Sequence, residues 1–113
     1  MSKYLLVYYG GNMGTSPDEV NKSMTEWNNW FKSMGKNLVD TGAPTMPGKM
    51  VTSRGVKSAM DGEMVSGYTV ISAGDMNEAV KIAKGAPGMD EGLKVAVYPM
   101  AEMPVPKTAR AAK

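Results

Sequence analysis

The side chains that could carry out acid–base chemistry in this sequence are carboxylates, phenols and basic groups. The chain has no histidine and no cysteine, which removes the commonest general base, the commonest metal ligand and all thiol chemistry. Asp61, followed by Gly62 and Glu63, could supply a general acid or base, although a solvated turn is the simpler interpretation. Arg54 and Lys57 could hold an anionic ligand in the same stretch, with ordinary surface charge as the alternative.

Three aromatic residues are further candidates for contact with a ligand. Tyr8 and Tyr68 could offer hydroxyl groups, or could pack against a second subunit. Trp30 lies about 80° from the centre of the apolar face of a predicted helix, so it could pack at the core edge, border a cleft or touch a partner. We therefore expect any ligand-binding site to draw on Tyr8, Trp30, Arg54, Asp61 and Tyr68, and we expect no cofactor and no metal site.

A long amphipathic helix is the strongest structural signal, and it runs from residue 16 to about residue 42. Ser16 and Glu19 form the Ser-x-x-Glu pattern of a capping box, and Pro17 suits the first helical position. Gly35 weakens the helix by roughly 1 kcal/mol, but the apolar pattern continues past it. The apolar stripe contains Val20, Met24, Trp27, Phe31, Met34 and Leu38.

Four strands and a second helix complete the predicted architecture. The strands are expected at residues 3–9, 49–53, 67–73 and 93–98, and the helix at 75–84, with Asp75 as its N-cap. Asp61 and Gly62 form a hairpin-like turn signal. The order β-α-β-β-α-β predicts a ferredoxin-like α+β sandwich: a four-stranded antiparallel sheet with two helices on one face. Residues 1–100 form a single domain, and 101–113 form a flexible tail rich in Pro, Ala and Lys.

Both faces of the predicted sheet are largely apolar. In the first strand, Leu5, Val7 and Tyr9 alternate with side chains that are equally apolar, and the other strands behave similarly. Two helices can cover only one face, so we expect a homodimer packed through the other sheet face. By one assignment, Tyr8 and Tyr68 share the face opposite the helices.

Charge and hydropathy exclude several classes of partner. The net charge of +2 lies entirely in the last thirteen residues, so the folded body is neutral and nucleic acid is not an expected partner. No apolar run approaches the ~20 residues of a membrane span. The N-terminus leads directly into a strand-like run and not a signal peptide, so the cytoplasm is the expected location.

Four stretches of the sequence together carry a resemblance to a known family: residues 3–8 (KYLLVY); 27–31 (WNNWF); 65–71 (VSGYTVI) with Asp75 and 78–80 (EAV); and 83–87 (AKGAP) with 95–99 (VAVYP). With these stretches placed on the predicted elements, the sequence resembles the YCII-related family of the dimeric α+β barrel superfamily. The resemblance implies a ferredoxin-like fold and a homodimer. A His–Asp pair proposed as catalytic in some relatives cannot exist here, and of an Asp-Gly-Pro-Phe signature only Asp61 and Gly62 match.

Two functions are compatible with these features. The first is a homodimeric small-molecule-binding protein with a cleft between sheet and helices, with or without a His-independent activity. The second is a non-catalytic accessory or structural dimerisation module. A buried polar group in an apolar pocket would favour the first, and a closed core without a pocket would favour the second.

Overall fold

The structure, a computed structural model, describes residues 1–11, 14–59 and 64–102. It belongs to the α+β class. Its elements, in chain order, are β1 (Ser2–Tyr9), α1 (Pro17–Met34), the 3₁₀ helix η1 (Gly35–Asn37), β2 (Leu38–Pro44), β3 (Lys49–Thr52), β4 (Gly55–Ser58), β5 (Val65–Ala73), α2 (Met76–Ala83), the 3₁₀ helix η2 (Met89–Glu91) and β6 (Lys94–Pro99).

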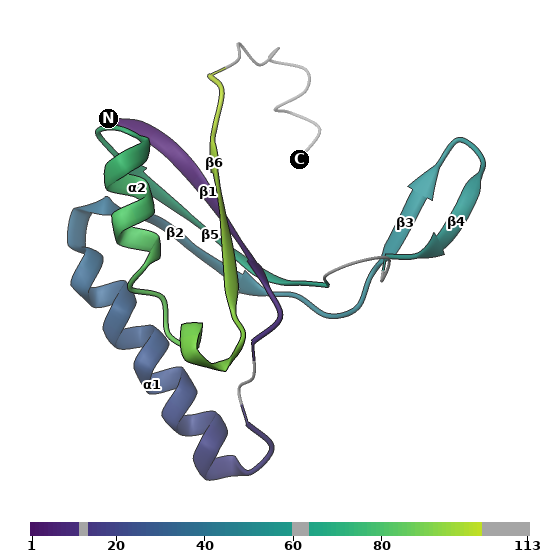
Figure 1. The fold of residues 1–113 in the computed structure, drawn as a ribbon, viewed down its shortest axis with the longest axis horizontal. Helices are drawn as coiled ribbons and strands as arrows, with labels where there is room; N and C mark the ends of the chain where they lie inside the picture. Colours follow the sequence, from purple (N-terminus) through teal and green to yellow (C-terminus); the bar gives the residue numbers. More distant parts are fainter. Residues whose placement is uncertain (12–13, 60–63, 103–113) are drawn as a thin grey trace, which may run out of the picture.

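Four strands form an antiparallel sheet in the order β2-β5-β1-β6, and both helices lie on the same side of it (Figure 1). The strand next to β1 on one side is β5, and on the other side is the last strand, β6. This arrangement is consistent with the ferredoxin-like sandwich predicted from the sequence.

The core lies between the helices and the inner face of this sheet. Tyr4, Leu6 and Tyr8 alternate along β1 and are all buried. The strands on either side supply Thr69, Ile71 and Ala73 from β5 and the half-buried Val95 and Val97 from β6, and α2 supplies Ala79 and Ala83. The inner face of the first strand is therefore the one that carries Tyr8.

Helix α1 begins as predicted but ends earlier. The Ser16 hydroxyl accepts a hydrogen bond from the Glu19 amide at 3.1 Å, and the Glu19 carboxylate accepts one from the Ser16 amide, so the capping box is confirmed. The predicted continuation to about residue 42 is wrong. Gly35 ends the helix at φ +55°, ψ −125°, a backbone conformation that side-chain-bearing residues rarely adopt. The chain then turns so that Leu38 opens β2.

The second strand of the main sheet is not the one that the sequence predicted. Residues 38–44 form β2 at the sheet edge. Its register with β5 shifts twice, between Leu38 and Asp40 and between Asp40 and Ala43, and the second shift includes Gly42. Residues 49–52 do form a strand, but it pairs only with β4 in a separate two-stranded sheet. The hairpin signal at Asp61 and Gly62 lies outside the described residues.

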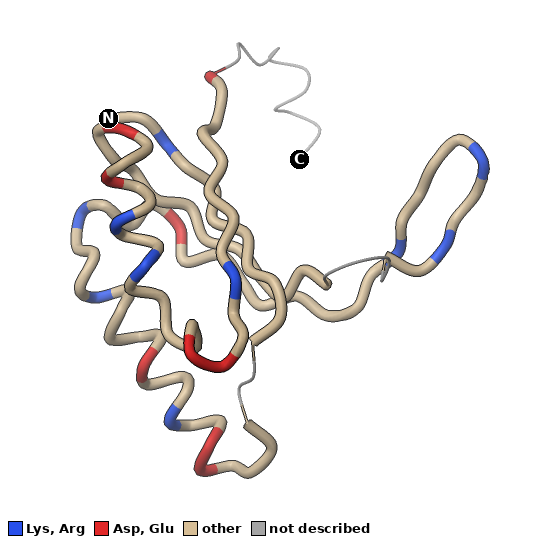
Figure 2. Tube along the Cα trace, viewed as in Figure 1, with Lys and Arg blue, Asp and Glu red and all other residues tan. Residues whose placement is uncertain are grey.

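The β3–β4 hairpin projects away from the helices and from the rest of the molecule (Figure 1). All of its strand residues are exposed. Its charges are all basic within residues 46–59: Lys49, Arg54 and Lys57, seen as blue segments in Figure 2. This hairpin is therefore a solvated arm and contributes nothing to the core.

The outer face of the main sheet is open among the described residues, and it is mostly apolar. Leu5, Val7 and Val70 are half-buried there, and Tyr68 and Tyr98 are exposed. Cross-strand register places Val7 beside both Tyr68 and Ala96, near the middle of this face. Of the predicted tail, residues 103–113 lie outside the described part of the chain.

Candidate functional site

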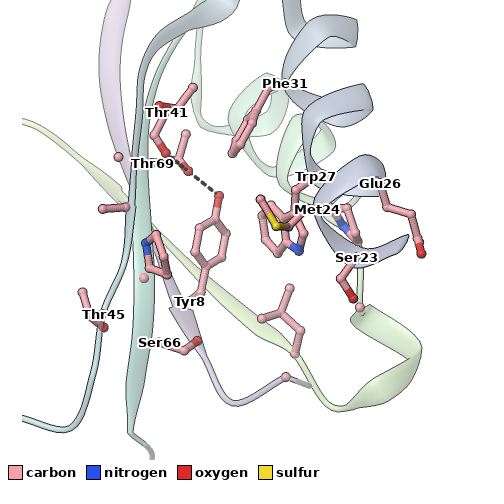
Figure 3. A pocket seen from close by; sticks show the side chains of 18 of the residues that line it. Tyr8, Ser23, Met24, Glu26, Trp27, Phe31, Thr41, Thr45, Ser66 and Thr69 are labelled. Atoms are coloured by element: carbon pink, nitrogen blue, oxygen red, sulfur yellow. Dashed lines mark hydrogen bonds between the residues drawn. The ribbon is translucent and has the colours of Figure 1, made fainter. Parts of the chain in front are cut away.

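A pocket of about 570 Å³ opens between α1 and the inner face of the sheet. Its volume is in the range typical of sites for small metabolites. Figure 3 shows its floor on the sheet, with Tyr8 in the centre, and its opposite wall on α1. The described lining residues are Tyr8, Gly10, Gly11, Ser23, Met24, Glu26, Trp27, Asn28, Phe31, Thr41, Gly42, Ala43, Pro44, Thr45, Met46, Ser66, Gly67, Thr69, Pro87, Gly88, Glu91 and Leu93.

A directed chain of hydrogen bonds crosses the floor of this pocket. The Tyr8 hydroxyl donates to Thr69 Oγ1 at 2.6 Å (Figure 3), and Thr69 Oγ1 donates to the Thr41 carbonyl oxygen at 3.0 Å. A carbonyl oxygen can only accept, and the threonine hydroxyl has one proton, so the direction of the whole chain is set by its last member. Three strands, β1, β5 and β2, are tied together by this chain.

Burial makes the Tyr8 phenol a weaker acid than the phenol of an exposed tyrosine. Loss of hydration raises the pKa of Tyr8 to about 12, and the hydrogen bond with Thr69 opposes part of this shift. The hydroxyl is therefore protonated at neutral pH. It can donate and accept hydrogen bonds, but it is poorly suited to act as a general base.

Aromatic rings form the wall of the pocket facing the sheet. The Trp27 ring meets the Tyr8 ring edge-on, with centroids 5.0 Å apart at 72°. Phe31, one turn further along α1, stands 6.0 Å from Trp27. Such contacts hold the rings in fixed orientations, so this wall is preformed.

Gly67 makes room for the Tyr8 ring. It is buried and stands directly across from Tyr8 in the β1–β5 pairing. A Cβ atom at this position would lie 3.0 Å from the Ala43 carbonyl oxygen and 3.4 Å from Cδ2 of Tyr8. Because the nearest obstacle is backbone, a larger residue here would displace β2 or the phenol ring.

The charged groups of the described lining are both acidic. Glu26 comes from α1 and Glu91 from η2, and neither Lys nor Arg is present in that lining. Both carboxylates are exposed, and Figure 3 shows the Glu26 side chain turned away from the aromatic rings. Within the described ranges, no group of three or more His, Cys, Asp or Glu side chains is placed to hold a metal ion.

The structure places the five predicted ligand residues in different parts of the molecule. Tyr8 lines the pocket, and it points toward the helices, not away from them as one assignment had it. Trp30 is buried behind the pocket, with its centroid 6.5 Å from that of Tyr8. Tyr68 lies on the opposite sheet face, because Tyr8 pairs with Gly67. Arg54 is at the hairpin turn, and Asp61 lies outside the described residues.

Several lining residues were not identified from the sequence. Trp27 and Phe31 were expected only as part of the apolar stripe of the helix, yet both are half-buried and border the pocket, whereas Trp30 is the more deeply buried ring. Thr69 gave a usable signal: it is a hydroxyl residue on the strand face that also carries Ile71 and Ala73. No sequence signal pointed to Thr41, because residue 41 was expected in a helix.

No protein-family model matches this chain, and no curated protein matches it. In the part of the chain that the structure describes, no helix combines the length and the hydropathy needed to cross a membrane.

Proposed function

We propose that this chain is a homodimeric small-molecule-binding protein of the YCII-related type, with a ferredoxin-like fold of the dimeric α+β barrel kind. The observation that carries the binding function is the buried Tyr8–Thr69–Thr41 chain on the floor of a mostly apolar pocket with an aromatic wall. A polar chain in such a place can orient a ligand that the aromatic wall encloses.

The sheet supports the family placement. The strand order β2-β5-β1-β6, with two helices on one face, is the order that a ferredoxin-like sandwich requires once the β3–β4 hairpin is treated as an insertion. The motifs that carry the resemblance lie on β1, α1, β5, α2 and β6, which together build this sandwich.

The outer sheet face supports the homodimer. An antiparallel sheet with one side in water usually alternates apolar and polar residues. Here Leu5, Val7 and Val70 face outward next to Tyr68 and Tyr98. A two-fold axis through this face would place the same apolar patch of each copy against the other. The same face favours the alternative function, a structural dimerisation module that binds no ligand.

A thermal-shift screen over a broad panel of metabolites tests the binding function. We expect at least one compound to raise the melting temperature, because a ligand that binds only the folded state stabilises it. The Tyr8→Phe variant should lose part of that shift, and Tyr68→Phe, on the opposite sheet face, should keep it. A panel with no stabilising compound would favour the structural module instead.

A further inference from the structure

Several hydrogen-bond donors on the sheet side of the pocket are committed within the protein. The Tyr8 and Thr69 hydroxyls donate along the chain that ends on the Thr41 carbonyl. The Thr45 hydroxyl donates to the Val65 carbonyl at 3.0 Å. Three lining amides are committed as well: Gly10 to the Met64 carbonyl, Gly42 to the Asp40 carboxylate and Thr45 to the Ser66 carbonyl.

The Tyr8 oxygen, in contrast, is still able to accept a hydrogen bond. A phenol oxygen that donates its proton keeps lone pairs with which to accept. Because the chain runs from Tyr8 toward Thr41, the Tyr8 oxygen at its start can offer a ligand only an acceptor. A ligand that supplies an N–H or O–H group therefore satisfies this oxygen, while a carboxylate or phosphate does not.

The charged residues around the pocket also favour a ligand with a positive charge. Both charged residues of the described lining, Glu26 and Glu91, are acidic, so the local potential repels anions and attracts cations. The rings of Tyr8, Trp27 and Phe31 present π-electron density that stabilises an organic cation within about 6 Å of a ring centroid.

Resting on the proposed binding function, we propose that the pocket selects an organic amine: an apolar or aromatic body between the rings of α1 and the sheet, with a cationic N–H group that donates to Tyr8. The pKa of Tyr8, raised to about 12, fits this assignment, since the phenol stays neutral and the acceptor geometry persists at any pH at which an amine is charged.

Isothermal titration calorimetry with three matched probes tests the selection. Tryptamine, its alcohol analogue tryptophol and the carboxylate indolepropionate share one aromatic body and differ in the terminal group. We expect tryptamine to bind most tightly, tryptophol more weakly and indolepropionate not measurably. Raising the ionic strength should weaken tryptamine alone, because only its binding depends on the acidic rim.

Substitutions of lining residues test which side chains contribute to the binding of tryptamine. Tyr8→Phe should weaken tryptamine about tenfold, the usual effect of losing a hydrogen bond to a charged group, and Glu26→Gln combined with Glu91→Gln should weaken it two- to threefold. Tyr68→Phe and Asp18→Asn, which alter a tyrosine and an acid outside the pocket, are the matched controls and should leave the affinity unchanged. Circular dichroism of each variant establishes that it is folded.

The outcomes separate this proposal from the proposed function. If indolepropionate binds as tightly as tryptamine and Tyr8→Phe weakens it, the pocket is a binding site but the amine selection is overturned. If no probe binds while a panel compound without an amino group does, the amine selection is overturned as well. If neither the probes nor the panel bind, both proposals fail.

Discussion

The Tyr8 hydroxyl links three strands through one hydrogen-bond chain, and its removal measures what that chain contributes. We expect Tyr8→Phe to lower the free energy of unfolding by about 1 kcal/mol, since Thr69 loses an incoming hydrogen bond while keeping its own bond to Thr41. Urea denaturation followed by circular dichroism measures this change. Tyr68→Phe is the matched control and should stay within about 0.5 kcal/mol of the parent; equal effects of the two substitutions would contradict the assignment.

The same phenol makes stability depend on pH in the alkaline range. The pKa of Tyr8 is raised to about 12 in the folded state from an ordinary value of 10.0. The unfolded chain therefore ionises first, and stability that is fully present below about pH 10 is lost as the pH rises to about 12, by roughly 3 kcal/mol. Denaturation midpoints across this range measure the slope. Tyr8→Phe should flatten it, and an unchanged slope in that variant would assign the effect to other groups.

The sequence indicated which types of side chain form the site more accurately than it indicated which positions supply them. Tyr8 was selected for its phenol, and the structure places it in the pocket. Tyr68 was paired with it by strand parity, but the sheet register sets Tyr8 against Gly67 and so turns Tyr68 outward. Likewise, the orientation of α1 on the sheet buries Trp30 and leaves Trp27 half-buried at the pocket, whereas the helical stripe had placed Trp27 at its centre and Trp30 beside it. Register and rotation depend on tertiary contacts, which periodicity alone does not specify.

At the scale of elements, β2 depends on one glycine. Gly42 has φ +70°, lies among the bulges of β2, and would press a Cβ atom into the Tyr68 carbonyl. We expect Gly42→Ala to destabilise the fold by about 3 kcal/mol, the sum of backbone strain and a clash with backbone atoms that cannot yield cheaply. Gly48→Ala is the control, because that position has open space and no positive φ.

Urea denaturation of both glycine variants measures these effects. The Gly48→Ala midpoint should equal or slightly exceed the parent value, since alanine restricts the unfolded chain more than glycine does. If Gly42→Ala were as stable as Gly48→Ala, the bulged geometry of β2 would not be what determines its position beside β5.

The elements with strong local signals were predicted well, and those defined by tertiary pairing were not. Strands β1, β5 and β6, helix α2 and the capped start of α1 all lie close to their predicted ranges. Strand β2 was missed because Leu38 continues the helical stripe, and only the backbone of Gly35 breaks it. Residues 49–52 have ordinary strand character, and nothing local distinguishes a hairpin arm from a strand of the main sheet.

At the scale of the whole molecule, the open sheet face predicts association. The parent protein should sediment as a dimer at micromolar concentration, and Val7→Glu, near the middle of that face, should sediment as a monomer, because a carboxylate there would be buried against its symmetry mate. Val51→Glu, an exposed valine on the hairpin, is the matched control. A monomeric parent would rule out the dimer.

The position of β6 has a consequence for the order in which the chain acquires its structure during synthesis. Its partner is the first strand, paired from Tyr4↔Pro99 to Tyr9↔Lys94 and closed by a hydrogen bond from the Met100 amide to the Lys3 carbonyl at 3.0 Å. In a nascent chain whose last synthesised element is α2, one edge of β1 has no partner strand. Val95 and Val97 are then not yet beside Tyr8 and Leu6. Such an edge readily pairs with other chains. Synthesis must therefore have passed about residue 100 before this sheet can close.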